Sequence, residues 1–123
     1  MATRQEQINT ILDRLSNNLG SELIGAVAAS SDGMVLASRL GSGINADRVA
    51  AVAATVMGIT RRVSKELTIG DSEEAILKAN KGLFLVMPIG DQSLLAVNIR
   101  EGANLGMVRL EAREATAAIS NIL

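Results

Sequence analysis

The sequence predicts a mixed α/β (α+β) domain, in which helices cover both faces of a five-stranded antiparallel sheet. Its 123 residues, of which 48% are hydrophobic, are enough for one core and one domain over residues 1–123. Apolar residues recur at helical spacing in three segments, at the start, in the middle and at the end of the chain. Five short apolar runs separated by turn residues lie between these segments, which gives the order αββαβββα.

The first segment carries helix signals at both ends. Thr3 and Glu6 fit a capping box, in which each side chain accepts a hydrogen bond from the other residue's amide. The apolar residues that share one helical face are Ile8, Ile11, Leu12, Leu15 and Leu19. Gly20 follows at the position where helices often end, so we expect this helix to end near Leu19.

A β-hairpin is predicted directly after this helix. The runs 23–30 and 34–39 flank Asp32-Gly33, a dipeptide that tolerates the positive φ angles of a tight turn. Residues 41–46 then match the outline G-x-G-x-x-A of a dinucleotide-binding loop. Because the preceding strand belongs to a hairpin and not to a βαβ unit, we interpret 41–46 as a plain connection between a strand and a helix.

A long helix is predicted from the N-cap Asn45 to about Leu67. Its larger apolar residues are expected on the sheet: Val49, Val52, Val56, Ile59 and Val63. A second surface is small and apolar, and consists of Ala50, Ala51, Ala54, Thr55, Met57 and Gly58. This surface favours a helix–helix interface between two copies of the chain. The alternative is that alanine is simply a good helix former and faces water here.

Three strands and a last helix complete the pattern. The runs 74–79, 83–89 and 93–99 are separated by turns, and we expect the five strands to follow one another as a meander. The last two runs are apolar on both alternating faces, which is typical of a sheet covered on both sides. The final helix, from Ala103 or Asn104 onward, has an apolar face of Leu105, Val108, Ala112, Ala115, Ile119 and Ile122.

The composition excludes several kinds of chemistry. Without Cys or His, the chain cannot form disulfides, thiolate nucleophiles, Cys-based zinc sites or a His general base. Its net charge is −1 and its only aromatic residue is Phe84, so counterion release and base stacking do not favour nucleic-acid binding. The acidic residues Asp71, Glu73, Glu74 and Asp91 fit turns or solvated surface. We therefore expect no enzymatic activity, no cofactor and no metal.

The chain is expected to be soluble and cytoplasmic. Residues 1–13 are polar and helical in pattern, unlike a signal peptide. The longest nearly apolar run, residues 49–59, is shorter than the roughly 18 residues that suggest a membrane span.

A basic cluster of Arg61, Arg62 and Lys65 lies in the second half of the long helix. Favourable interaction with the helix dipole and ordinary solubility would account for it. The functional interpretation is a basic rim beside the apolar surface, where acidic side chains of a partner dock. A third, more remote interpretation is an arginine finger for another protein's phosphoryl-transfer site.

Three stretches, residues 25–38, 47–54 and 104–110, resemble the roadblock/dynein light-chain domains. They match the opening hairpin, the alanine-rich central helix and the start of the final helix of that family, in the same order. The resemblance covers nearly the whole chain and implies the αββαβββα, profilin-like roadblock fold.

The resemblance also implies a non-enzymatic homodimer that pairs through the central helix and the strand after it, about residues 72–80. The expected interface residues are Ala50, Ala51, Ala54, Met57, Gly58, Ala75 and Leu77. Bacterial and archaeal relatives, such as the MglB-type polarity regulators, act as partners or activators of Ras-like small GTPases. We therefore expect a regulator or scaffold that binds such a GTPase, through Arg61, Arg62 and Lys65, and modulates its GTP hydrolysis or localisation.

Two alternatives stay open from the sequence. One is a structural, self-assembling subunit of a larger complex that has no GTPase client. The other, less favoured, is a small-ligand sensor that uses a pocket of the profilin-like fold. In each case we expect neither nucleic-acid binding nor membrane insertion.

Overall fold

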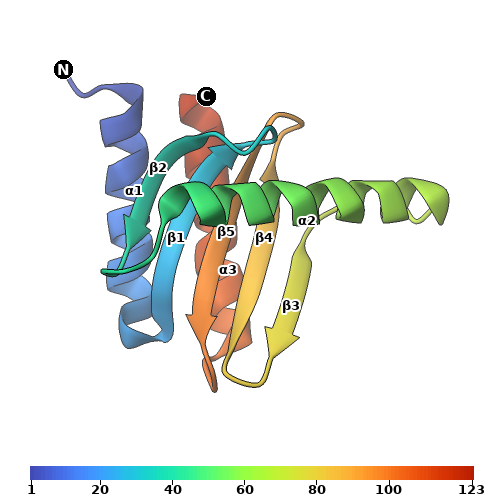
Figure 1. The fold of residues 1–123 in the computed structure, drawn as a ribbon. Helices are drawn as coiled ribbons and strands as arrows, with labels where there is room; N and C mark the ends of the chain where they lie inside the picture. The colour runs from blue at the N-terminus through green and yellow to red at the C-terminus, as the bar shows by residue number, and fades with distance from the viewer.

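The computed structural model describes residues 1–123 and consists of one five-stranded sheet with helices on both faces (Figure 1). The helices are α1 (Arg4–Leu19), a short 3-10 turn η1 (Gly20–Glu22), α2 (Ala46–Glu66) and α3 (Leu105–Ile122). The strands are β1 (Leu23–Ser30), β2 (Val35–Leu40), β3 (Ala75–Ala79), β4 (Gly82–Ile89) and β5 (Ser93–Arg100). The α+β class and the order αββαβββα predicted from the sequence are confirmed.

Each α-helix begins at a side-chain cap. At α1 the capping box is present: Thr3 Oγ1 accepts from the Glu6 amide at 3.1 Å, and Glu6 Oε1 accepts from the Thr3 amide at 3.2 Å. Asn45 and Asn104 cap α2 and α3 in the same way, each accepting from the amide three residues later. These caps satisfy amides that have no partner inside the helix, and so they fix where each helix starts.

The predicted meander is wrong, because the strands lie in the order β2-β1-β5-β4-β3. β1 pairs with β5 as well as with β2, so β2 and β3 become the two edges. α2 connects these edges by crossing the whole sheet (Figure 1). A helix of this length carries the chain from one edge to the other, which a short turn cannot do.

The core consists of two layers, one on each face of the sheet. α1 and α3 cover one face over a large cluster that includes Ile8, Leu12 and Ile119. α2 covers the other face over a smaller cluster that includes Val27 and Leu94. The central strands β4 and β5 are buried on both faces, as their continuous apolar sequences predicted.

α2 lies on the sheet through a face next to the valine-rich face that was predicted. Its buried residues are Ala50, Ala53 and Met57, whereas Val52, Ile59 and Val63 are exposed. The small side chains let the helix lie close to the sheet, whose own Val and Leu side chains fill the space. The expected assignment is therefore wrong for Val52, Ile59 and Val63, whereas Val49 and Val56 are half-buried against the sheet as predicted.

The alanines Ala51 and Ala54 have a partner within the chain. Gly33, at φ +88° in the β1–β2 turn, lies against α2 so closely that a methyl group on it would be 3.5 Å from the Ala51 Cα. The same methyl group would be 3.7 Å from the Ala54 Cβ. The β1–β2 turn thus lies beside Ala51 and Ala54, and its glycine adopts the positive φ angle that the turn requires.

Candidate interaction surface

α2 is longer than the sheet is wide. Its 21 residues extend about 31 Å at 1.5 Å per residue. Five strands spaced about 4.8 Å apart span only about 19 Å between the outer two. The C-terminal part of α2 therefore projects past β3 (Figure 1), and no residue from 58 to 66 is buried. We call residues 58–66 the overhang.

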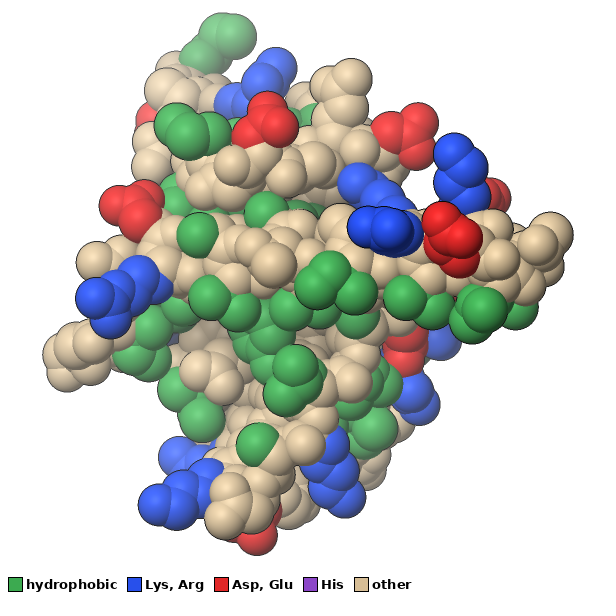
Figure 2. Space-filling model, turned by 45° about the vertical axis from the view of Figure 1, so that its right-hand side comes forward, with side chains coloured by type: hydrophobic (Ala, Val, Ile, Leu, Met, Phe, Trp, Pro, Cys, Tyr) green, Lys and Arg blue, Asp and Glu red, His purple; other side chains and the backbone are tan.

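A row of large apolar side chains follows one flank of α2 into the overhang. We call this row the apolar stripe; it consists of Val52, Val56, Ile59, Val63 and Leu67. The spacings of four, three, four and four residues place all five on one side of a helix. Ile59 is 61% exposed and Leu67 is 64% exposed. Figure 2 shows hydrophobic side chains in a row along this helix and on the sheet surface below it.

The apolar stripe borders an uncovered part of the sheet. Leu77 of β3 is 55% exposed, and it pairs across the strands with Phe84, which packs on the α2 side. A groove of about 820 Å³ lies between the overhang and the start of β3, with Ile59, Val63 and Ala75 among its lining residues. β3 itself is hydrogen-bonded only to β4, so its outer backbone groups are free to pair.

These elements place the predicted interface residues in different environments. Ala50 and Met57 are buried against the sheet of their own chain and are not available to a second copy. Ala51, Gly58 and Leu77 are exposed, while Ala54 and Ala75 are half-buried. The sequence reasoning missed the apolar stripe as an exposed surface, although the excess of helix length over sheet width was a signal for it.

Arg61, predicted on a partner-facing rim, is instead turned toward the chain's own turns. Its Nη1 donates to Ser31 Oγ at 3.3 Å and to the Asp91 carbonyl at 3.2 Å, and its Nη2 donates to the Gly90 carbonyl at 3.2 Å. It therefore fastens α2 to the β1–β2 and β4–β5 turns. Arg62 and Lys65 are exposed and have no ion pair, so they are the free cations of the cluster.

We expect Arg61→Ala to lower the free energy of unfolding by about 1–2 kcal/mol, because charge-assisted bonds to two turns are lost. Chemical denaturation with a matched Arg62→Ala variant checks this, since Arg62 has no such contacts and should change stability by less than about 0.5 kcal/mol. Equal decreases in the free energy of unfolding for the two variants would show that the contacts of Arg61 with the turns do not stabilise the fold.

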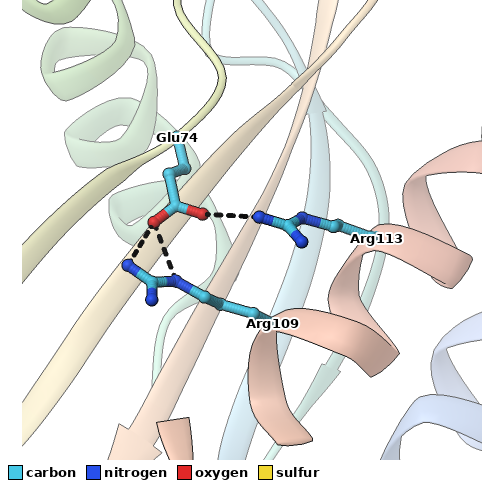
Figure 3. A network of polar contacts seen from close by, with 3 residues as sticks. All are labelled: Glu74, Arg109 and Arg113. Atoms are coloured by element: carbon cyan, nitrogen blue, oxygen red, sulfur yellow. Dashed lines mark hydrogen bonds and ion pairs between the residues drawn. The ribbon is translucent and has the colours of Figure 1, made fainter. Parts of the chain in front are cut away.

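Glu74, predicted as a solvated surface residue, forms a half-buried ion pair. Its side chain is only 18% exposed, and its Oε2 accepts from Arg109 Nε at 2.9 Å and from Nη2 at 2.7 Å (Figure 3). Arg113 approaches the other oxygen at 3.7 Å. Since Glu74 immediately precedes β3 and both arginines are on α3, this network pins the start of the edge strand to the helix behind the sheet.

Glu74→Gln should destabilise the fold by about 1–2 kcal/mol, because Arg109 loses its charged partner in a partly desolvated place. A double-mutant cycle with Arg109→Gln isolates the pair: the two losses should be clearly less than additive. Additive losses would mean that the pair contributes no coupling energy. Glu73→Gln, at the exposed neighbouring position, provides the control.

A polar groove of about 720 Å³ lies beside the overhang, on the side of the β4–β5 turn. It is lined by no hydrophobic residue, and its cations Arg61 and Lys65 are balanced by Asp71 and Asp91. No group of three or more acidic residues lies close enough together to hold a metal ion. None of the helices combines the length and the apolar sequence that a membrane span requires.

The sheet order, the two-layer core and the single long helix on one face together define an α+β fold of the roadblock type. The chain belongs to the Roadblock/LC7 domain family, whose model matches residues 9–98. It is 27% identical over 114 residues to the uncharacterized protein MJ0714 of Methanocaldococcus jannaschii, covering 91% of this chain and 96% of that protein. A second uncharacterized protein of that organism, MJ1340, is 28% identical over 112 residues, with the same coverage.

Solved structures share the fold. The gliding protein MglB of Thermus thermophilus superimposes with a TM-score of 0.86 at 22% identity, over 99% of this chain and 92% of that one. MglB of Myxococcus xanthus gives a TM-score of 0.89 at 18% identity, over 99% and 91%. A Roadblock/LC7 domain from Streptomyces avermitilis gives 0.85 at 20% identity, over 91% and 93%. The roadblock fold predicted from the sequence resemblance is thereby confirmed.

Proposed function

We propose that the chain is a non-enzymatic homodimeric regulator or scaffold that binds a Ras-like small GTPase and modulates its GTP hydrolysis or localisation. The observation that supports the homodimer is the overhang with its exposed apolar stripe. The GTPase part of the proposal rests on the family's GTPase partners, and on the free cations Arg62 and Lys65, which lie on the same helix outside the stripe.

Two uncovered surfaces of the single chain support the proposed dimer. A row of five large aliphatic side chains, of which only Val56 is half-buried, is a contiguous apolar patch of the kind that marks an interaction site. The overhang has no sheet beneath it, and the sheet around Leu77 has no helix above it. Burial of these surfaces by a second copy provides the hydrophobic driving force for association.

A two-fold axis beside β3, perpendicular to the sheet, satisfies all of these features together. It pairs β3 with the same strand of the second copy in antiparallel orientation, which completes the free edge. It also lays each overhang across the uncovered sheet of the partner, with the two apolar stripes side by side. Such an interface is self-complementary, as two-fold symmetry requires.

The proposed GTPase surface is the outer side of the paired α2 helices. Arg62 and Lys65 lie outside the apolar stripe and stay in solvent when the stripes pair. Cations at such a rim attract an acidic partner surface and raise the association rate. Because Arg61 is bonded to its own turns, the proposed rim consists of Arg62 and Lys65.

Any stimulation of GTP hydrolysis would come mainly from positioning the catalytic groups of the GTPase. The chain has no His and no Cys, and Arg61 is hydrogen-bonded to turns of its own chain. Holding a loop of the GTPase in its reactive geometry lowers the barrier without adding a chemical group.

A pull-down from native lysate tests this function directly. The tagged chain is incubated with lysate supplemented with GTP and, separately, with GDP, and retained proteins are identified by mass spectrometry. A Ras-like GTPase retained in one nucleotide state more than in the other supports the proposal. Retention of the untagged chain alone would favour a structural, self-assembling subunit. One solved MglB structure has a tetrameric arrangement, which is an example of such self-assembly.

A further inference from the structure

A small pocket lies behind the sheet, between the β3–β4 turn and the start of α3. Its volume is about 180 Å³, and half of its ten lining residues are hydrophobic. The apolar part includes Leu83, Ile99 and Leu105. Leu83 and Ile99 belong to the core layer under α1 and α3, so the pocket opens on the face opposite α2 and is separate from the apolar stripe.

Gly82, one of the lining residues, lies close against β5. A methyl group at this position would lie 2.9 Å from the carbonyl oxygen of Ile99, which is too close for any side chain to occupy. β4 therefore approaches β5 closely at a residue without a side chain. The neighbouring lining residues Ala79 and Ala103 are also small.

The rim of the pocket is basic. Lys78 and Arg100 line it, and Lys81 lies in the turn between the lining residues Ala79 and Gly82. None of these three cations forms an ion pair, and the acidic residue at the rim is Glu101. In a chain whose net charge is −1, three unpaired cations around one apolar hollow are a local excess that favours a negatively charged ligand.

We infer that this pocket binds an acidic segment of a partner protein, with one apolar side chain of that segment in the hollow and its carboxylates on Lys78, Lys81 and Arg100. Protein interfaces commonly place an apolar side chain of one partner in a pocket of the other and charged residues around the rim. A membrane surface fits less well, because the apolar atoms here line a hollow and do not project. A nucleic acid lacks an aromatic stacking partner, since Phe84 packs on the α2 side.

The test uses the full chain and four acidic twelve-residue peptides that differ only in the central residue: Leu, Phe, Met or Ser. Binding is followed by fluorescence anisotropy at low and at high salt. We expect saturable binding of at least one peptide with an apolar centre, at least fivefold tighter than the Ser peptide, and weaker at high salt. Lys78→Glu and Arg100→Glu should each weaken this binding at least fivefold.

Two further variants separate the pocket from general electrostatics. Arg48→Glu makes the same charge change at the exposed start of α2 and should leave binding within twofold. Ala103→Leu fills the hollow without a charge change and should abolish the advantage of the apolar centre, while thermal unfolding checks that the fold persists. Equal affinity for all four peptides, no saturable binding of any, or equal effects of Arg48→Glu and Lys78→Glu would overturn the inference. So would binding to vesicles rich in phosphatidylserine with no peptide binding.

Discussion

Ile59→Asp should separate the dimer into folded monomers and raise its dissociation constant by about a thousandfold or more. Ile59 lies in the middle of the apolar stripe and is 61% exposed in the single chain, so a carboxylate there remains hydrated in the monomer. In the dimer the carboxylate would be buried without a partner, beside the same carboxylate of the second copy. Burial of an unpaired charge costs about 4 kcal/mol or more, which corresponds to that factor.

Two matched variants make this result specific. Leu110→Asp introduces the same carboxylate in place of an exposed aliphatic residue on α3, behind the sheet, and should leave the dimer intact. Met57→Asp, two residues from Ile59, should unfold the chain, because Met57 is only 1% exposed and packs on the sheet. Light scattering gives the mass and circular dichroism the fold. A dimeric, folded Ile59→Asp variant would contradict the proposed interface.

The double reversal Arg62→Glu with Lys65→Glu should slow association with the GTPase by about a hundredfold at low ionic strength. Both side chains are exposed, without ion pairs, and flank the proposed docking surface, so their charge acts mainly on the encounter. The salt dependence of the association rate should flatten, and the dimer should remain. Stopped-flow measurements at several salt concentrations check all three expectations.

Arg4→Glu with Arg14→Glu provides the control, because it makes the same charge change on α1, behind the sheet. It should slow association far less. If the single change Arg62→Ala abolished the stimulation of GTP hydrolysis by about a thousandfold without weakening binding, the positioning account would be wrong and an arginine finger right.

The local structure was predictable from the sequence because its signals are local. The capping box at Thr3, the caps at Asn45 and Asn104 and the Asp32-Gly33 turn each act over four residues or fewer. Coverage of both sheet faces was predictable from the continuous apolar runs of β4 and β5. The strand order was not, because it depends on which strand pairs with β1 after the chain has crossed the sheet.

The orientation of α2 and the contacts of Arg61 and Glu74 depend on distant parts of the chain. Hydropathy ranks valine and isoleucine above alanine, and so it assigned the apolar stripe to the core. Only the packed structure shows that α2 rests on the sheet through Ala50, Ala53 and Met57. The partners of Arg61 are about 30 residues away and those of Glu74 are 35 or more away, separations at which a sequence pattern carries no signal.

The most direct test is the mass of the complex in solution. The wild-type chain is mixed with a Ras-like small GTPase from the same cell, loaded first with a non-hydrolysable GTP analogue and then with GDP, and measured by light scattering after gel filtration. The proposal predicts that the chain alone has about twice its mass of 12.8 kDa, and that in one nucleotide state the dimer gains the mass of the GTPase. A chain that is monomeric at micromolar concentration, or a dimer that binds no such GTPase in either state, would contradict it.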